Sequence, residues 1–253
     1  MRRWQGLQQQ LKRVLVRLPH RQRIVERLGH RLLVDPSELH GFYVYYEREY
    51  DDFVFEFLQG RLAAYPRALD LGANIGIYTV FLASQVKEVD AFEPEPAVLP
   101  RLRANLALNG VKNVRVHETC VGSILGRIAF EPPGRRNAGI GKVSTAMAGC
   151  SYPCTTLDEF FGGPLDEPCF IKMDVEGAEW LVLQAAQAIS HPNVPVALLI
   201  EIHPGEIRDL GGSVTELRLL LENMGYAVQA LTPAGLQPLG VEDFRFWWAT
   251  SQG

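Results

Sequence analysis

Two acidic side chains and two glycines in the middle of the chain have the types and the spacing of an adenosine site. Asp70 ends a short apolar run, and Gly72 and Gly76 follow it directly, ahead of an amphipathic segment. Glycines at such a strand-to-helix turn let a ligand approach the backbone closely. Glu93 ends the next apolar run, where a carboxylate can accept hydrogen bonds from both hydroxyls of a ribose. Together these residues predict an adenosine pocket.

The composition of the glycine loop distinguishes between adenosine cofactors. A pyrophosphate needs a close-packed Gly-x-Gly-x-x-Gly turn at a helix N-terminus, and this loop does not have that pattern. Its polar groups are Asp70 and Asn74, which suit a cofactor with an ammonium, a carboxylate and a sulfonium in place of the diphosphate. The loop therefore favours S-adenosylmethionine; the alternative is a tight strand-to-helix turn that binds no ligand.

Asp174 and Glu176 form a second candidate pair, directly after the apolar run 170–173. In a doubly wound sheet, the ends of neighbouring strands on either side of the switch point face one crevice, so these carboxylates would emerge beside the cofactor. Their expected roles are orientation of the cofactor and contact with a substrate hydroxyl. The alternative is that they only cap the following helix, whose N-terminus favours acidic side chains.

Glu201 and His203 end the next apolar run and point to the same side, because alternate side chains of a strand face opposite ways. An acid beside an imidazole suits general acid–base chemistry, and we predict His203 as the general base. Asp174 or Glu176 is the alternative base, and His203 could also be a loop residue without a catalytic role. No metal ligand is assigned, although Asp174, Glu176 and Glu201 could offer oxygen ligands to magnesium if the crevice gathers them.

Apolar runs alternate with helical patterns from residue 67 onward, which is typical of βαβ units. The predicted fold class is α/β, with a doubly wound, mainly parallel sheet and an N-terminal helical extension. Helices are expected over Ile77–Gln85 and Ala97–Leu108, and capping boxes at Thr156 and Ser213 open two more. The expected strands are Ala68–Leu71, Val89–Phe92, Val114–Glu118, Phe170–Met173, Val196–Ile202, Tyr226–Leu231 and Phe244–Thr250, the last two antiparallel to each other.

The N-terminal segment is basic and amphipathic. Residues 1–33 carry nine lysines or arginines against one glutamate, and the apolar residues of 4–18 recur at three- and four-residue steps. A second short helix is expected with Ile24, Val25 and Leu28 on its apolar face. The charged face is expected to be solvated; the alternative is a surface that attracts anionic lipid headgroups or an acidic partner.

These patterns divide the chain into an extension, residues 1–45, and a main domain, residues 46–253. Within the main domain, the stretch 122–150 lacks helical periodicity and is expected to form a hairpin or a mobile flap. The four cysteines show neither a disulfide framework nor zinc-ligand spacing, and no secretory h-region follows the basic start, so we expect a cytoplasmic protein. The apolar stretches are too short to span a bilayer.

The chain resembles the FkbM-type methyltransferases, which are class I S-adenosylmethionine enzymes that mostly methylate hydroxyl groups of sugars and natural products. The block Lys-Met-Asp-Val-Glu-Gly at 172–177 is the most specific part of the resemblance. The matching segments are Ala68–Thr79, Ala91–Pro94, Asn105–Gly110, Thr155–Asp158, Ile171–Glu179 and Leu199–His203, in the family's order. The resemblance implies a Rossmann-like, seven-stranded sheet and S-adenosylmethionine as the cofactor.

The resemblance also implies a role for each part of the cofactor site. Asp70, Gly72 and Asn74 would hold the methionine end and Glu93 the ribose, and the turn from Glu118 to Cys120 would hold the adenine. Glu49 is similar to an acidic position of the family, and Glu47 is an equally near candidate. The expected cofactor-binding residues are Glu49, Asp70, Gly72, Ala73, Asn74, Gly76, Glu93, Pro94, Glu118, Thr119 and Asp174.

The predicted function is S-adenosylmethionine-dependent O-methylation of a hydroxyl on a saccharide, glycolipid or natural product, by direct in-line transfer. One alternative is a non-catalytic module that binds the cofactor on the same fold. A nicotinamide oxidoreductase would need the missing pyrophosphate turn. A nucleic-acid methyltransferase would fit the basic N-terminus, but the remainder is acidic and has no Asn- or Asp-Pro-Pro-aromatic loop, so no nucleic-acid partner is expected.

Overall fold

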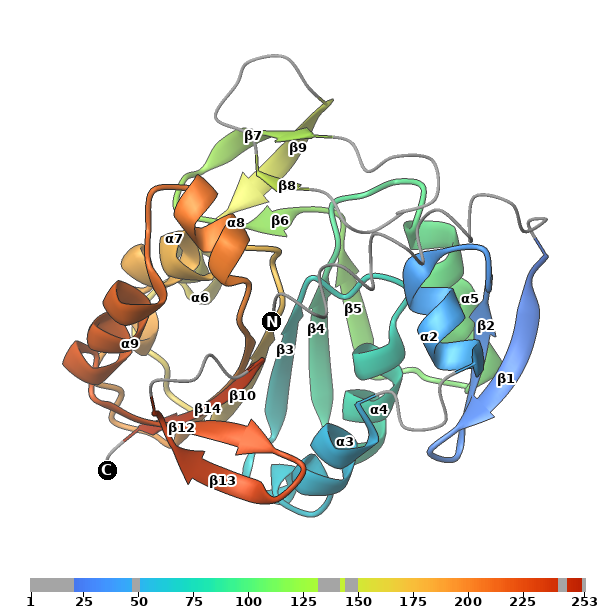
Figure 1. The fold of residues 1–253 in the computed structure, drawn as a ribbon, viewed down its shortest axis with the longest axis horizontal. Helices are drawn as coiled ribbons and strands as arrows, with labels where there is room; N and C mark the ends of the chain where they lie inside the picture. Colours follow the sequence, from blue (N-terminus) through green and yellow to red (C-terminus); the bar gives the residue numbers. More distant parts are fainter. Residues whose placement is uncertain (1–20, 47–50, 132–141, 144–149, 241–244, 252–253) are drawn as a thin grey trace.

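The computed structural model describes residues 21–46, 51–131, 142–143, 150–240 and 245–251. Its centre is an eight-stranded sheet with helices packed on both faces, so the molecule has three layers (Figure 1). This is the doubly wound α/β class predicted from the alternation of strands and helices.

The main sheet has the strand order β13-β12-β14-β11-β10-β3-β4-β5. The five strands from β11 to β5 are parallel, and β14 runs antiparallel to both β11 and β12. The chain therefore reverses its strand order between β3 and β10, which is where ligands bind in sheets of this kind. The strands are β3 Arg67–Leu71, β4 Glu88–Phe92, β5 Val114–His117, β10 Cys169–Met173, β11 Val196–Glu201, β12 Tyr226–Thr232, β13 Gly235–Pro238 and β14 Phe246–Ser251.

Seven of these strands were expected, and each was placed within two residues of its observed ends. The eighth, β13, corrects the expected count of seven. It pairs antiparallel with β12 through a short turn in which Thr232 accepts a backbone hydrogen bond from Ala234. A four-residue edge strand has too few apolar residues to show a period, so the sequence did not reveal it.

Alternation along the central strands explains why helices cover both faces. In β10, Ile171 belongs to the core cluster of one face and Phe170 to that of the other, and both side chains are fully buried. Strands buried on both sides read as continuous apolar runs, as this one does. One face packs on α3 (Asp52–Leu58), the short 3₁₀ helix η1 (Leu62–Ala64), α4 (Ile77–Gln85) and α5 (Leu99–Leu108), and the other on α6 (Leu157–Phe161), α7 (Glu179–Gln184), η2 (Gln187–Ile189), α8 (Pro204–Asp209) and α9 (Val214–Asn223).

The two predicted capping boxes are confirmed. The Thr156 hydroxyl accepts a hydrogen bond from the backbone nitrogen of Glu159 at 3.1 Å and begins α6. The Ser213 hydroxyl does the same for Glu216 at 3.2 Å and begins α9. Each hydroxyl satisfies a backbone N–H that has no partner inside its helix. Among the described helices, none is both long and apolar enough to cross a membrane.

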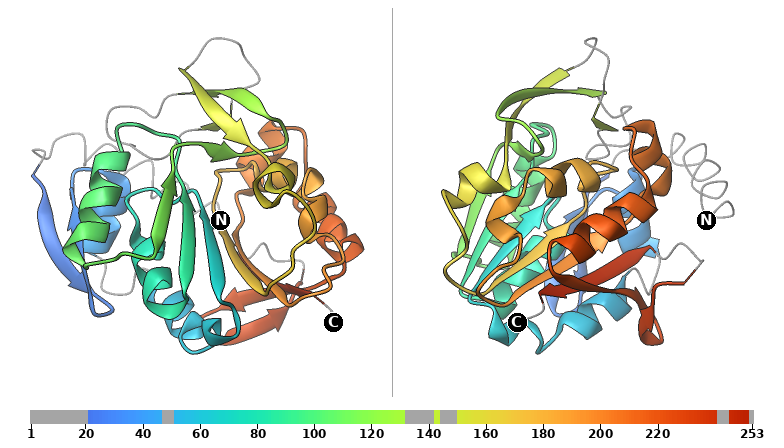
Figure 2. Two further views of the ribbon diagram at one scale, coloured as in Figure 1. Left: turned by 180° about the vertical axis from the view of Figure 1, so that it is seen from behind. Right: turned by 90° about the vertical axis from the view of Figure 1, so that its left-hand side faces the viewer.

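A second, smaller sheet lies over the carboxyl edge of the main one, at the same end of the molecule in all views (Figures 1 and 2). Its strands β7 and β9 are antiparallel, as expected for a hairpin in the 122–150 stretch. The residues between them at 132–141 and 144–149 lie outside the described part of the chain. The strands are β6 Cys120–Val121, β7 Gly126–Glu131, β8 Lys142–Val143 and β9 Cys150–Thr155.

The expected helix around Ile24 to Leu28 is wrong. Residues 23–34 form an antiparallel hairpin of β1 (Arg23–Arg27) and β2 (His30–Val34). Leu28 and Gly29 connect the strands with φ values of +51° and +77°, the backbone of a tight two-residue hairpin loop. The spacing of Ile24, Val25 and Leu28 is compatible with one helical face, whereas Leu28 lies in the turn between two strands. The other expected helix, over residues 4–18, lies outside the described residues.

Two asparagine side chains of α5 accept hydrogen bonds from backbone nitrogens of β2, as a neighbouring strand would, and so attach the β1–β2 hairpin to α5. Asn109 Oδ1 accepts from the Arg31 backbone nitrogen at 2.9 Å, and Asn105 Oδ1 accepts from that of Leu33 at 2.6 Å. The next element, α2 (Leu39–Tyr46), packs beside β2 and is joined to α5 by the ion pair between Glu38 and Arg101. The hairpin therefore carries α2 to the carboxyl edge of the sheet.

Candidate active site

A cavity of about 710 Å³, including the space at its mouth, opens where β3, β4 and β10 end beneath the small sheet. Its polar wall consists of the ends of these strands, and its apolar wall comes mainly from the small sheet and α7. The polar wall includes Gly72, Glu93, Pro94, Glu95, Asp174 and Glu176, and the apolar wall includes Phe92, Val121, Ile128, Tyr152 and Leu181. Five of the predicted site residues thus share one cavity.

Glu93 sits at the end of β4 with only 4% of its surface exposed. One carboxylate oxygen accepts from the backbone nitrogen of Asn74 and the other from that of Glu95, each at 2.8 Å. Burial raises the pKa of Glu93 to about 7, against the opposing effect of these two hydrogen bonds. Each oxygen of a carboxylate has more than one acceptor position, so Glu93 can still accept hydrogen bonds from a ligand in the cavity.

Gly72 allows the ends of β3 and β10 to meet. Its φ is +79°, and a Cβ at this position would lie 1.9 Å from the backbone oxygen of Asp174. The backbone nitrogens of Gly72 and Ala73 donate to the carbonyl of Phe92 at 3.1 and 2.9 Å, which ties the loop to β4 as well. Position 72 therefore requires glycine for two reasons, which are its positive φ and the close approach of the Asp174 backbone.

We expect Gly72→Ala to lower the free energy of unfolding by about 3 kcal/mol or more and to abolish cofactor binding, because the loop must move away from Asp174. The matched control is Gly60→Ala: its φ is +78°, but no atom lies within 4 Å of its Cβ position. That variant should lose only the cost of the left-handed backbone, about 1–2 kcal/mol. Chemical denaturation of both variants measures the difference, and equal losses would contradict the steric argument.

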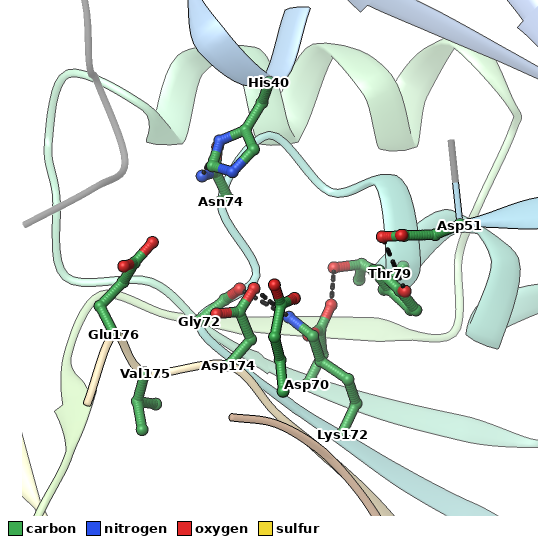
Figure 3. A network of polar contacts seen from close by, with 12 residues as sticks. His40, Asp51, Asp70, Gly72, Asn74, Thr79, Lys172, Asp174, Val175 and Glu176 are labelled. Atoms are coloured by element: carbon green, nitrogen blue, oxygen red, sulfur yellow. Dashed lines mark hydrogen bonds and ion pairs between the residues drawn. The ribbon is translucent and has the colours of Figure 1, made fainter. Parts of the chain in front are cut away.

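Lys172 is a buried cation at the switch point, with 3% of its surface exposed. Its Nζ lies 3.1 Å from the carbonyl oxygen of Gly72, 3.3 Å from Asp70 Oδ1 and 3.5 Å from Asp174 Oδ2 (Figure 3). Burial alone would lower the pKa of Lys172, but the charges of Asp70 and Asp174 raise it above its usual value. Lys172 therefore joins the glycine loop to β10 as a permanent cation.

Asp70 does not line the cavity in this structure. Its side chain is fully buried, with one oxygen accepting from the Thr79 hydroxyl at 2.6 Å and the other facing Lys172. The geometry favours an indirect role, in which Asp70 and Lys172 hold the loop that a ligand touches. Gly76 also has a structural reason to be glycine. It begins α4 with a φ of +86°, and a Cβ added at this position would lie only 2.5 Å from the Leu102 side chain.

His203 lies among four carboxylates. Its Nδ1 donates to Glu179 Oε1 at 3.0 Å, and its Nε2 lies 3.7 Å from Asp174, 3.8 Å from Glu201 and 3.9 Å from Glu176. Burial alone would lower the pKa of His203, but the hydrogen bond to Glu179 and the neighbouring negative charges raise it well above its usual value. In this arrangement the neighbouring carboxylates favour the protonated imidazole, and the general-base role of His203 stays a prediction.

Glu201 is also committed to a structural contact. It accepts from Arg245 Nε at 2.8 Å, and the same guanidinium donates to Asp51 at 2.7 Å. Burial alone would raise the pKa of Glu201, but the positive charges around it, with Arg245 foremost, lower it to about 2. Glu201 is thus held in its ionised form by Arg245, and its predicted catalytic role stays a prediction.

The alternative that Asp174 and Glu176 only cap α7 is not what the structure shows. No side-chain cap is formed at Ala178, the residue before α7. The backbone nitrogens of Gly177 and Val175 donate instead to Glu179 Oε1, at 3.1 and 3.4 Å. Asp174 and Glu176 are therefore left facing the cavity.

The sequence analysis missed His40, which α2 brings over the glycine loop (Figure 3). Its Nδ1 lies 3.0 Å from the side-chain nitrogen of Asn74. An amide nitrogen can only donate, so Nδ1 accepts and the ring proton is on Nε2. Burial lowers the pKa of His40, and the charges of Asp174 and Glu201 only partly offset this. The signal was hidden because α2 lies before the alternating part of the chain.

The remaining predicted cofactor residues have varied positions. Glu118 is exposed and forms an ion pair with Arg103, and neither Glu118 nor Thr119 belongs to the cavity wall. The wall in that region begins at Cys120. Glu49, together with its alternative Glu47, lies outside the described residues. The cavity wall in that region thus lies two to three residues further along the chain than the expected turn, and only Cys120 belongs to both.

Comparisons with known proteins identify the family of this chain. The family model described as "Methyltransferase FkbM domain" matches residues 70–228. The hexuronic acid methyltransferase AglP of Haloferax volcanii is 32% identical over 158 residues, which is 60% of this chain and 63% of that protein. The match therefore spans less than two thirds of AglP.

Two solved structures illustrate the similarity at lower identity. SMU.1697c, a putative methyltransferase from Streptococcus mutans in complex with SAH, is 15% identical with a TM-score of 0.46, over 79% of this chain and 95% of that one. A SAM-dependent methyltransferase from Agrobacterium tumefaciens is 11% identical with a TM-score of 0.49, over 93% and 71%. The family assignment rests on the sequence match, which runs from the glycine loop into β12 and covers more than half of the chain: this chain belongs to the FkbM methyltransferase family.

Proposed function

We propose that this protein transfers the methyl group of S-adenosylmethionine to a hydroxyl oxygen of a saccharide acceptor. The observation that carries the proposal is the buried carboxylate of Glu93 in a cavity that also contains Gly72 and Asp174. The name of the relative AglP supports a uronic-acid-containing saccharide as the acceptor class.

The residues of the cavity fit S-adenosylmethionine. Glu93 is placed to accept both ribose hydroxyls, and the apolar side chains of Phe92, Val121 and Ile128 suit the faces of an adenine ring. At Gly72 the glycine loop lies close to the backbone of Asp174, which leaves a narrow space for the amino-acid end of the cofactor. Asp174 would offer a carboxylate to the cofactor's ammonium group. No diphosphate-binding turn competes with this arrangement.

Bound S-adenosylmethionine supplies an electrophilic methyl group on its sulfonium. The protein's part is to hold an acceptor oxygen in line with that methyl group at about 3 Å and to exclude water. The small sheet covers the cavity, and Tyr152 in β9 donates a 2.6 Å hydrogen bond to Glu95 on its floor. Asp174 and Glu176 line the cavity, and in this proposal one of their carboxylates receives the acceptor's proton.

The experiment that tests the proposal is incubation of the purified protein with methyl-labelled S-adenosylmethionine and a panel of saccharides with and without uronic acids. We expect labelled product that survives mild alkali, because a methyl ether is stable to base. Label released by alkali would show a methyl ester and contradict the hydroxyl acceptor. Cofactor binding without transfer to any saccharide would favour a non-catalytic module.

Binding of S-adenosylhomocysteine should strengthen as the pH rises from 5.5 to 8. Burial raises the pKa of Glu93 to about 7, and its ionised form is the better acceptor for two hydroxyl donors. Below pH 7 the protonated carboxyl loses an acceptor position, so affinity should fall by up to about tenfold per pH unit. Calorimetry across this range measures the effect. Glu93→Gln should bind more weakly with little dependence on pH, and a flat wild-type profile would contradict the prediction.

A further inference from the structure

Asp174, Glu176 and His203 bring three metal-ligating atoms to one point beside the cavity. One oxygen of each carboxylate and Nε2 of His203 all lie within 4.8 Å of one another. Hard divalent cations sit about 2.0–2.6 Å from their oxygen and nitrogen ligands, so ligand atoms around one ion are roughly 3–5 Å apart. The three atoms have that spacing. We propose that this cluster is a binding site for a divalent cation of the Mg²⁺ or Mn²⁺ type.

The Glu176 carboxylate is the strongest support for the proposal. It is largely buried, with 19% of its side chain exposed, and no other described residue donates a hydrogen bond to it. Its nearest charged partner, His203 Nε2, is 3.9 Å away, which is too long for a hydrogen bond. Because Glu176 lines the cavity, its partner must come from what binds there, and a cation between Glu176 and His203 would be such a partner.

The neighbour on the other side of the imidazole points to the same conclusion. Glu179 is completely buried and accepts the Nδ1 proton of His203 at 3.0 Å. Metal-binding histidines almost always donate their second ring nitrogen to such a carboxylate or carbonyl, which fixes the ring and directs the first nitrogen at the ion. Glu179 therefore holds His203 with Nε2 facing Asp174 and Glu176.

The chemistry of the ligands indicates the class of ion. Two carboxylates and one imidazole, without a thiolate in the cluster, suit Mg²⁺ or Mn²⁺ better than Zn²⁺ in a structural site. Both Asp174 and Glu176 line the cavity, so the ion would have coordination positions open toward it. Glu201, whose oxygen lies 3.8 Å from Nε2, is held by Arg245 and stays outside the ligand set.

The open positions give the ion a use in acceptor recognition, and this part rests on the proposed function. A saccharide oxygen or a uronate carboxylate could occupy them, and the ion would offset the negative charges that otherwise face an acidic sugar. Binding of the ion itself needs neither the cofactor nor the acceptor, so it can be tested alone.

The test is a titration of the chelator-treated, full-length protein with MnCl₂, followed by the electron paramagnetic resonance of free Mn²⁺. We expect one Mn²⁺ per chain and competition by Mg²⁺. Glu176→Gln and His203→Gln should each weaken binding by about tenfold or more. The control Asp209→Asn removes an exposed carboxylate of α8 outside the cluster and should bind as wild type does.

Two outcomes would overturn the proposal: no Mn²⁺ bound by the wild type at millimolar concentration, or equal affinity in wild type and both cluster variants. The first outcome depends only on the stoichiometry of the wild type, so it can be decided even if a variant fails to fold. S-adenosylhomocysteine binding by each variant shows that its cavity is intact. Methyl transfer to a saccharide with no Mn²⁺ binding would remove the metal site and leave the proposed function standing; Mn²⁺ binding without transfer would do the reverse.

Discussion

Lys172→Met is expected to lower the free energy of unfolding by about 3–5 kcal/mol. The substitution keeps most of the unbranched side chain but removes the cation that faces the fully buried Asp70, and an unpaired buried charge is among the costliest defects in a protein. Urea denaturation followed by fluorescence measures the loss. The control is Lys112→Met, an exposed lysine, which should change the stability by less than about 0.5 kcal/mol.

A double variant separates the loss of charge pairing from a packing defect. Asp70→Asn combined with Lys172→Met removes both charges, so part of the stability lost in Lys172→Met should return. If the double variant loses more free energy of unfolding than the two single variants lose together, packing around Lys172 is the larger contribution. If Lys172→Met unfolds like the control, the buried pair does not hold the glycine loop.

Glu93→Ala is expected to weaken S-adenosylhomocysteine binding by about 100-fold or more. Two hydrogen bonds from ribose hydroxyls to a carboxylate contribute about 1.5–3 kcal/mol each, and each 1.4 kcal/mol is a factor of ten in affinity. Calorimetry at pH 8, where the carboxyl is ionised, measures the effect. Glu88→Ala is the control, because Glu88 is an exposed residue at the opposite end of the same strand.

Glu93→Gln should give an intermediate loss, since its amide keeps one oxygen acceptor. This variant matters because Glu93 also accepts from the backbone of Asn74 and Glu95, and alanine releases both. Affinity of Glu93→Ala within about threefold of wild type would show that the ribose is held elsewhere, and the proposed placement of the cofactor would be wrong.

The central sheet could be predicted from the sequence because its strands are buried on both faces. Such strands appear as continuous apolar runs, and the glycines and acids at their ends mark the ligand edge. Gly72, Glu93 and Asp174 were found in this way, and the structure places all three on one cavity.

The misses have a common physical origin in contacts between distant parts of the chain. His40 reaches the glycine loop only because the β1–β2 hairpin docks on α5, and nothing local in its helix indicates this. The electrostatic environment of His203 depends on carboxylates of the 174–179 stretch, so it could not be deduced from the strand that precedes it. Local patterns reveal elements and their ends, but not the electrostatics of side chains that meet across them.

The docking of the N-terminal hairpin has a practical consequence for anyone who trims this protein. The family match begins at residue 70, which suggests a minimal fragment from that point. Such a fragment would lose β2 and α2 and would leave Ile75 and Val98, buried against Leu32, Val34 and Val44, open to water. The smallest piece suitable for expression, crystallisation or fusion should therefore start upstream of Arg23.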